Sequence, residues 1–284
     1  MPLFRRHDGD LVRGEPPMRR IMPYLMPGRN ESIILNDSTF WIEKTRAWLK
    51  AYNRSHEEHA TLFHVLAYAV SQALHARPEL NRFVSGGRLY RRRGVQISFV
   101  VKKDLSDDGA STTVKLAIAP GERFTEVAAR LAAAIREAQQ SERAVDRETA
   151  LIMRLPGPVV RSLVAFAKLL DHWNLFPRFM TTPDPMFASI FLANLGSVGI
   201  SDAYHHLYEY GTVSIFGAVS APAYLPFVEG DAVVARPGLR VRWSFDERIH
   251  DAFYSARSLG LVRDIFEAPE QHLGPPEGDP RYRG

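Results

Sequence analysis

Residues 239–252 of the chain read LRVRWSFDERIHDA and join an apolar stretch to a strongly charged one. We predict a strand over 239–245 and a second strand over 231–235, with Pro237-Gly238 as the turn of a hairpin between them. The charged stretch 246–251 therefore begins where the predicted strand ends.

The rest of the chain alternates irregularly between predicted helices and hairpins. The clearest helix is 60–77, in which apolar residues recur every three or four positions until Pro78 stops it. Residues 83–90 are predicted as a hairpin around Gly86-Gly87. Further predicted helices are 40–52, 126–140, 150–176 (divided at 156–158) and 255–266, and further predicted strands are 32–35, 95–101, 112–118, 187–192 and 213–219, with a turn at 107–109. This order predicts an α/β fold, a two-layer sandwich in which helices flank a mixed β-sheet.

The composition excludes several classes of site. Hydrophobic residues make up 45% and charged residues 24% of the chain, values typical of a globular protein with a sizeable core. No cysteine is present, which excludes a disulfide framework, a thiolate metal site and a cysteine nucleophile. The histidines pair at 56/59 and 205/206 without a third ligand at metal-binding spacing, so no metal is expected.

The net charge of +4 comes partly from the short arginine runs Arg5-Arg6, Arg19-Arg20 and 91–93. Such runs are usually solvated faces, and the alternative is attraction for an anionic ligand such as the phosphates of a nucleotide cofactor. Aromatic residues do not interleave with the arginines, so nucleic-acid binding is not expected.

We divide the chain into a flexible lead (1–17), one globular domain (18–267) and a flexible tail (268–284). Within the domain, 19–30 is expected to be an extended, irregular arm. The first residues lack the apolar core of a signal peptide, and the absent cysteines fit a reducing compartment, so a cytoplasmic location is expected. The apolar stretch 159–176 is predicted as a core helix, with a lid, an acyl-chain pocket wall or a membrane-surface contact as alternatives.

Several segments resemble one protein family in the same order along the chain. The resemblance rests on Ser244-Phe245-Asp246 with Arg248 and Asp251, on the turn at 77–81 (RPELN), on the strand 95–101, on the loop 191–196 (FLANLG) and on the arm at 18–21 (MRRI). The family is the catalytic domain of the acyltransferase component of 2-oxo-acid dehydrogenase complexes, which shares its fold with chloramphenicol acetyltransferase. The resemblance covers roughly 18–267. Neither a lipoyl-bearing domain nor a subunit-binding segment is recognisable, so a stand-alone domain is expected.

The resemblance implies a chemistry. In that family a histidine removes the proton of the coenzyme A or dihydrolipoamide thiol, the thiolate attacks a thioester carbonyl, and a serine or threonine hydroxyl donates to the oxyanion. An aspartate four residues after the histidine pairs with an arginine and holds the loop; this role passes to Asp251, with Arg19 or Arg20 as its partner. Arg248 and Asn194 keep the family's residues. The resemblance also implies a homotrimer, with a coenzyme A channel between neighbouring subunits.

The chain departs from the family at the reacting positions. Glu247 stands where the histidine is expected, Ala193 where the hydroxyl is expected, and Ala252 where a glycine follows the aspartate. A glutamate carboxyl in water has a pKa of about 4.3 against about 8.5 for a thiol, so burial would have to raise it before it could act as an efficient base. His250, one residue before Asp251, is outside the register of the base.

Substitutes for the lost groups are His205 or His206 for the base and Ser197 for the hydroxyl. A surface or packing role is the alternative for the two histidines. Two functions remain open on this basis. One is an acyltransferase that moves an acyl group between a coenzyme A thioester and an acceptor. The other is a non-catalytic homologue that keeps the fold for ligand binding or assembly.

Overall fold

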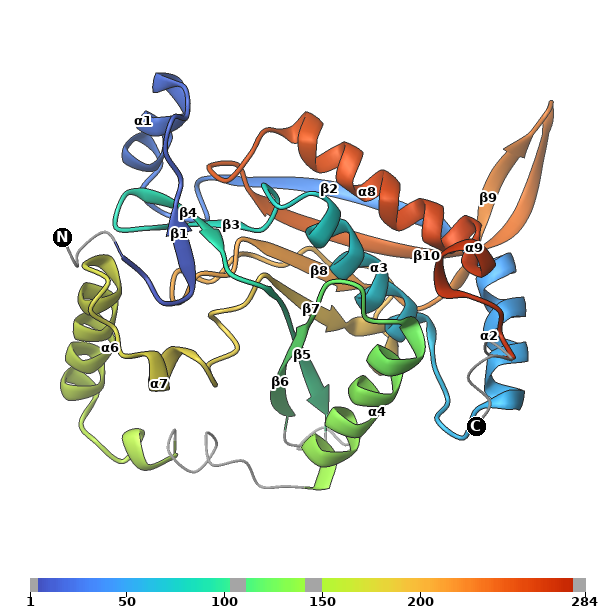
Figure 1. The fold of residues 1–284 in the computed structure, drawn as a ribbon, viewed down its shortest axis with the longest axis horizontal. Coiled ribbons are helices and arrows are strands. Elements are labelled where there is room, and N and C mark those ends of the chain that lie inside the picture. The colour runs from blue at the N-terminus through green and yellow to red at the C-terminus, as the bar shows by residue number, and fades with distance from the viewer. Residues whose placement is uncertain (1–4, 103–110, 141–149, 278–284) are drawn as a thin grey trace.

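The computed structural model describes residues 5–102, 111–140 and 150–277. A seven-stranded sheet forms its centre, with the strand order β2-β10-β8-β7-β5-β6 and with β9 paired to β10 (Figure 1). Its strands are β2 (Ile33–Trp41), β5 (Val95–Lys102), β6 (Ser111–Ile118), β7 (Ile190–Asn194), β8 (Ile215–Val219), β9 (Ala223–Glu229) and β10 (Ala232–Asp246). The pairs β5–β7 and β7–β8 are parallel and the other pairs are antiparallel, which confirms the predicted mixed sheet.

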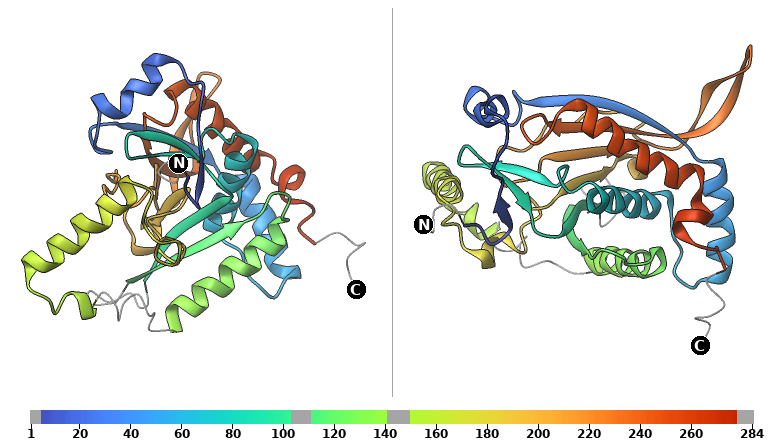
Figure 2. Two further views of the ribbon diagram at one scale, coloured as in Figure 1. Left: turned by 60° about the vertical axis from the view of Figure 1, so that its left-hand side comes forward. Right: turned by 45° about the horizontal axis from the view of Figure 1, so that its top comes forward.

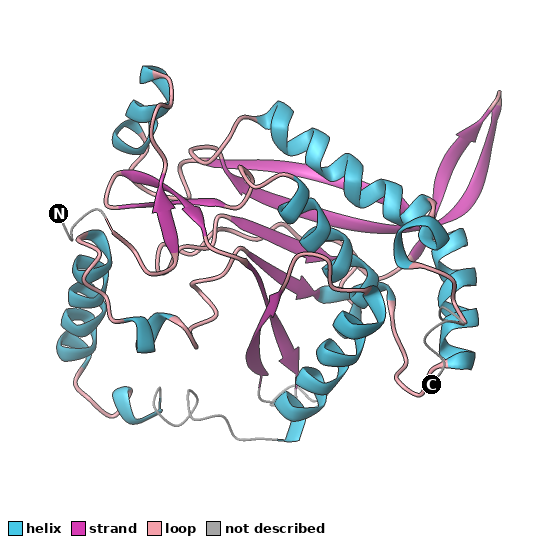
Figure 3. Ribbon diagram, in the orientation of Figure 1, coloured by secondary structure: helices cyan, strands magenta, loops and turns pink. Residues whose placement is uncertain are grey.

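Helices pack against one face of this sheet, as Figures 2 and 3 show. They are α2 (Glu43–Ser55), α3 (Leu62–Ala76), α4 (Phe124–Gln140) and α8 (Ala252–Glu267). α3 lies at the centre of the helical layer. From the sheet, Val241, Trp243 and Phe245 of β10 join the same buried apolar cluster. The side chains on the inner face of β10 and those on the apolar faces of the helices therefore form one core. The predicted two-layer α/β architecture is confirmed.

His64 lies in the first turn of α3, where its ring closes a capping box. Its Nδ1 accepts hydrogen bonds from the backbone N–H (3.2 Å) and the hydroxyl (2.8 Å) of Thr61, so the proton of the neutral ring is on Nε2. The side chain is buried, and burial lowers its pKa to about 4. In the unfolded chain a histidine titrates near 6.5.

We expect His64 to make the protein less stable in weak acid. Between pH 6.5 and pH 4 the histidine is protonated in the unfolded state but stays neutral in the folded state. The free energy of unfolding therefore falls by about 3 kcal/mol as the pH drops through this window. His64→Gln keeps an acceptor in the capping box and removes the titration, so urea unfolding of that variant should lack this component. His272→Gln, at an exposed histidine, is the control. An unchanged pH dependence in His64→Gln would contradict the assignment.

A second, three-stranded antiparallel sheet stands beside the main sheet (Figure 1). It consists of β1 (Gly9–Leu11), β4 (Arg88–Arg92) and β3 (Arg82–Ser85), in that order. The predicted hairpin between β3 and β4 is confirmed. Gly86 and Gly87 have φ values of 56° and 69°, the backbone that a tight two-residue hairpin turn requires and that glycine adopts without strain.

The expected flexible lead is wrong for its described part. Residues 9–11 form β1, and Arg6 is buried. Its guanidinium lies 2.8 Å from the carboxylates of Asp8 and of Asp171 and donates to Ser85 Oγ at 2.9 Å. A buried cation persists when such partners compensate its lost hydration, and this contact holds the lead against the body of the molecule. At the other end, the expected tail begins with the short helix α9 (Pro269–Leu273).

The expected extended arm is also wrong, because residues 17–25 form the helix α1 (Pro17–Leu25). Pro17 occupies the first helical position, where an N–H would have no partner within the helix. Pro23 lies in the last turn of the short helix, where it removes one hydrogen bond and the helix ends soon afterwards.

The C-terminal hairpin does not turn at Pro237-Gly238. β10 runs without interruption through both residues, and its hairpin partner is β9, which lies before it in the sequence. The carbonyl of Pro237 accepts the N–H of Ile42, and the Ile42 carbonyl accepts from Arg46 in α2. Another residue at position 237 would donate its N–H to the Ile42 carbonyl, but this carbonyl already accepts from Arg46. The proline therefore costs the strand no hydrogen bond here, which is why the strand tolerates it.

Two other expectations change at their boundaries or lie outside the described residues. β2 extends to Trp41, so the helix expected over 40–52 begins at Glu43. The predicted turn at 107–109 lies outside the described residues.

α6 (Gly157–His172) stands at the periphery, and the expected core helix is wrong because none of its residues is buried (Figure 1). Its apolar side chains point into solvent. Those at least two-fifths exposed on or directly after α6 are Val159, Leu163, Val164, Phe166, Leu169 and Trp173. Asp171 attaches the helix to the body through Arg6. No helix in the described ranges combines the length and the apolar character that crossing a bilayer requires.

Candidate active-site turn

A buried ion pair fixes the turn that follows β10. The Nε and Nη2 atoms of Arg248 donate to the two carboxylate oxygens of Asp246 at 2.8 Å each, and both side chains are almost fully buried. Ser32 Oγ donates to the same carboxylate at 3.1 Å. Arg248 Nη1 donates to the carbonyls of Met26 and Pro27 at 2.9 Å each. The pair therefore ties the turn to the segment between α1 and β2.

Glu247 lies between the two members of this ion pair and is half-buried. Its backbone is held on both sides, because its N–H donates to the Ser32 carbonyl at 2.8 Å and its carbonyl lies 3.5 Å from Arg19 Nη1. Among the described residues, its carboxylate has neither a hydrogen bond nor an ion pair. The turn thus presents acceptor oxygens that no described group of the protein uses.

Asp251 ends the turn and begins α8. Its carboxylate accepts the N–H of Tyr254 at 2.8 Å as the N-cap, and this hydrogen bond lowers the pKa of the group. Arg19 Nη2 lies 3.6 Å from the other carboxylate oxygen. Of the two arginines expected as partners, Arg19 is therefore near Asp251, whereas the side chain of Arg20 makes no hydrogen bond or ion pair within the described part of the chain.

His250 is already occupied. Its Nδ1 accepts the backbone N–H of Asp251 at 2.9 Å, so Nε2 carries the proton and donates to Glu79 at 2.9 Å. Glu79 also lies 3.1 Å from the buried Arg82. The turn at 77–81 therefore packs against the turn after β10 through these polar side chains, a contact for which the sequence gives no spacing signal.

The loop after β7 lies at the other end of the sheet. Asn194 pairs with Val219 of β8, and Val219 pairs with Val241 of β10, five residues before Asp246. At about 3.3 Å per strand residue, roughly 16 Å of β10 separates the two places. One chain therefore does not bring Asn194 and Glu247 together.

The substitute hydroxyl is engaged within this same loop. Ala193 is buried in β7, and Ser197 lies in the short 3-10 helix that follows. Ser197 Oγ donates to the carbonyl of Asn194 at 2.6 Å, so its proton is already used. Asn194 is half-buried, and its side-chain amide has two N–H donors, whereas the hydroxyl proton of Ser197 is already donated.

His205 and His206 lie on a segment that crosses the sheet near β8 and β10. The ring of His205 stacks on Phe216 at 4.0 Å between ring centres, and its backbone carbonyl accepts the hydroxyl of Ser244. His205 Nδ1 lies 2.7 Å from the His206 carbonyl, which only accepts, so Nδ1 carries the proton. Burial lowers the pKa of His205, which favours a neutral ring with a free Nε2. His206 is exposed.

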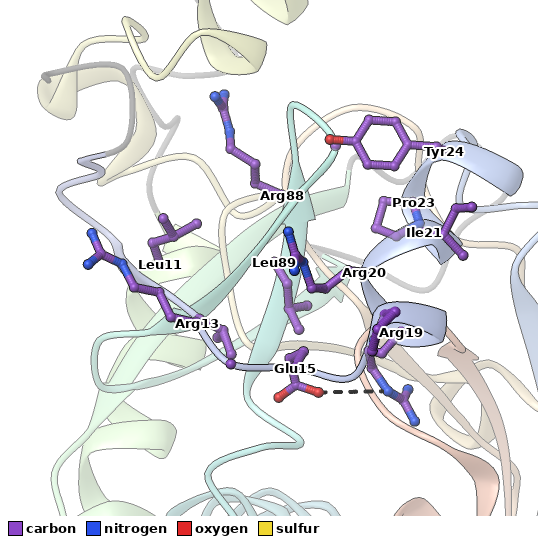
Figure 4. Close-up of a pocket in the computed structure, with 14 residues that line it drawn as sticks. Leu11, Arg13, Glu15, Arg19, Arg20, Ile21, Pro23, Tyr24, Arg88 and Leu89 are labelled. Carbon is purple, nitrogen blue, oxygen red and sulfur yellow. Dashed lines mark ion pairs between the residues drawn. The ribbon is translucent and has the colours of Figure 1, made fainter.

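A cavity of about 640 Å³ adjoins the turn and is lined by β1, α1 and the β3–β4 hairpin (Figure 4). Arg19 lines this cavity and also reaches Asp251 and the carbonyl of Glu247. A neighbouring cavity of about 420 Å³ lies beyond Tyr24. Across the described ranges, no three histidine, aspartate or glutamate side chains are grouped to hold a metal ion.

Comparison with known proteins places the fold. No protein-family model matches the sequence, and no curated protein does. Among solved structures, the chain is similar to a probable dihydrolipoamide acetyltransferase from Listeria monocytogenes 4b F2365, with 13% identity over 91% of this chain and 94% of that one and a TM-score of 0.59. It is also similar to chloramphenicol acetyltransferase, with 14% identity, 91% and 99% coverage and a TM-score of 0.53.

A third similar structure is the dihydrolipoamide acetyltransferase of Azotobacter vinelandii, with 18% identity, 92% and 94% coverage and a TM-score of 0.60. In that enzyme a serine, a histidine and an asparagine were investigated for their roles in catalysis. The chain therefore has the α/β fold of acyltransferase catalytic cores. More narrowly, its fold is the one that chloramphenicol acetyltransferase and the dihydrolipoamide acetyltransferase cores share.

Proposed function

We propose that the protein transfers an acyl group between a coenzyme A thioester and an acceptor. The observation that carries this proposal is the carboxylate of Glu247, which has no partner among the described residues and lies on a turn that the buried Asp246–Arg248 pair fixes within an acyltransferase fold. The cytoplasm, with its coenzyme A thioesters and its reducing conditions, is the proposed compartment.

In this reaction Glu247 is the base. Its carboxylate takes the proton from the nucleophile of the acceptor, the nucleophile attacks the thioester carbonyl, and coenzyme A leaves as a thiolate that recovers the proton. The acyl–sulfur bond breaks and the acyl–acceptor bond forms, so the products are the acylated acceptor and free coenzyme A. The side-chain amide of Asn194 is the proposed donor to the oxyanion, because the hydroxyl of Ser197 is already used.

Release of the coenzyme A thiol from acetyl- and longer acyl-coenzyme A, measured with candidate acceptors, tests the proposal. Calorimetric titration with coenzyme A separates binding from turnover. Absence of both binding and thiol release would contradict any coenzyme A-dependent function.

The second candidate is a non-catalytic homologue kept for ligand binding or assembly. Two observations favour it: Ala193 is buried where the family has a hydroxyl, and a carboxylate replaces the imidazole at position 247. Coenzyme A binding without thiol release from any acyl-coenzyme A would support this candidate over the first.

We further propose a homotrimer in which each site lies between two copies. Its support is the separation of Asn194 from Glu247, which lie at opposite ends of the sheet in one chain, so that a neighbouring copy has to bring them together. The similar structures include the cubic core of the pyruvate dehydrogenase multienzyme complex.

The exposed apolar face of α6 is the surface that we expect a neighbouring copy to cover. A glutamate in place of Phe166, which is 57% exposed, would be buried without a partner in the trimer, so Phe166→Glu should shift the sedimenting species from trimer towards monomer. Ala47→Glu adds the same charge to an exposed position of α2 and should leave the trimer intact. A wild-type monomer that co-sediments with anionic phospholipid vesicles would contradict this assignment and favour a membrane-surface role for α6.

A further inference from the structure

The cavity of about 640 Å³ beside the active-site turn has the size of a small-molecule site and a one-sided charge. Its charged lining residues are the four arginines 13, 19, 20 and 88 and one carboxylate, that of Glu15. The buried Arg82 lies 3.2 Å from this carboxylate and Arg19 lies 3.9 Å from it, so cations already surround it. The excess of positive charge is therefore not neutralised from within the cavity wall.

Two of these arginines are uncommitted. Arg13 and Arg20 are exposed, and within the described ranges neither guanidinium group has a hydrogen bond or an ion pair. They come from different elements, the segment after β1 and the helix α1, and they line the same cavity (Figure 4). Guanidinium groups match the geometry of phosphate and carboxylate oxygens and form strong charge-assisted hydrogen bonds with them.

The neighbouring cavity shows a different use of arginine. It is lined by Arg29 and Arg248, but both guanidinium groups are buried and donate to backbone carbonyls of the surrounding segments. Those two arginines hold the chain together. The guanidinium groups of Arg13 and Arg20 hold no described segment in place, so both are available to an anion in the cavity.

Apolar groups complete the wall of the first cavity. Ile21 and Tyr24 of α1 are exposed towards solvent and face it together with Leu89 of β4. Arg19 joins the cavity to the active-site turn, because the same guanidinium lies 3.5 Å from the carbonyl of Glu247. Glu247 does not itself line the cavity, so a molecule with its anionic end at the arginines would reach it by extending past Arg19.

We infer that this cavity binds the anionic group of a substrate, a phosphate or a carboxylate, through Arg13 and Arg20. The inference rests on the proposed function, because it makes the group bound there part of a molecule that reacts at Glu247. A phosphate would come from the coenzyme A side of the reaction, and a carboxylate from the acyl group or the acceptor.

Calorimetry with coenzyme A, pantetheine and glutarate tests the inference. Pantetheine is the part of coenzyme A that carries no phosphate, and glutarate is a dicarboxylate without phosphate. The variant Arg13→Gln/Arg20→Gln is compared with Arg46→Gln/Arg263→Gln, which removes two exposed arginines of α2 and α8 that do not line the cavity and whose side chains have no hydrogen bond or ion pair among the described residues.

The cavity variant should bind one of the two anions at least about tenfold more weakly than wild type, while the control variant binds it normally. A loss for coenzyme A with unchanged pantetheine binding assigns the site to phosphate, and a loss for glutarate assigns it to carboxylate. Raising the salt concentration should weaken the same interaction.

Equal anion binding by the two double variants would overturn the inference, as would failure of the wild type to bind either anion. A wild type that binds glutarate through these arginines but neither coenzyme A nor pantetheine would refute the proposed function and leave the anion site standing. Normal coenzyme A binding by both variants, with unchanged glutarate binding, would leave the proposed function standing without this site.

Discussion

Replacing Arg248 by methionine should lower the free energy of unfolding by about 3–5 kcal/mol. The substitution leaves the carboxylate of Asp246 buried without the cation that donates to both its oxygens, although Ser32 still donates to one oxygen and the buried Arg29 remains near it. It also removes both hydrogen bonds to the carbonyls of Met26 and Pro27. A urea titration, with the slope of the unfolding transition compared between proteins, measures the effect.

The double variant Asp246→Asn/Arg248→Met should be less destabilised than Arg248→Met alone, because it removes the buried carboxylate together with the cation that pairs with it. Arg46→Met removes an exposed arginine and should change the stability by less than about 0.5 kcal/mol. A single Arg248→Met variant as stable as this control would show that the ion pair does not hold the turn.

The sequence predicts the local elements of the fold well, because their signals are local. Helix α3 and strand β5 follow from apolar periodicity and flanking breakers within a short window, and the structure confirms both. A proline wrongly predicts the end of a strand where another segment already uses the carbonyl that would have accepted the missing N–H. At Pro237 the facing carbonyl is occupied by α2, a contact that no local pattern reveals.

The lead is a second case in which long-range contacts, which leave no local signal in the sequence, decide the structure. Nothing periodic marks residues 5–11, and their order comes from the burial of Arg6 between Asp8 and Asp171, which lies far away in the sequence. Contacts over such a separation depend on the complete fold and not on propensity. An arginine run that the sequence suggests is a solvated face contains, at Arg6, a buried structural cation.

The candidate site divides in a similar way. The motif around Asp246 predicts a turn, and the structure places Glu247, Asp251 and Arg19 together there. The loop at Asn194 is part of the same resemblance but lies at the other end of the sheet. Sequence order cannot show this separation, because strand register across β7, β8 and β10 decides it.

Glu247→Gln should lower kcat/KM for acyl-coenzyme A by about 10²–10⁴-fold, the contribution typical of a positioned general base. Glutamine keeps the size and the backbone contacts of the residue but cannot accept the proton. Coenzyme A binding should stay close to that of wild type, because the carboxylate holds no described group in place. Glu57→Gln, at an exposed glutamate, should leave both quantities unchanged.

Two further variants decide which group is the base. Glu247→His restores the imidazole that the family resemblance implies, and it should give a rate that rises with pH around the histidine pKa of about 6.5. His205→Gln removes the alternative base, whose Nε2 is free. If the rate survives Glu247→Gln but is lost in His205→Gln, the base is His205, and the unpartnered carboxylate on the turn has another role. If Glu247→His turns over acyl-coenzyme A and the wild type does not, the turn supports the reaction once it carries an imidazole. The glutamate of the wild type then leaves a site that binds coenzyme A without turnover.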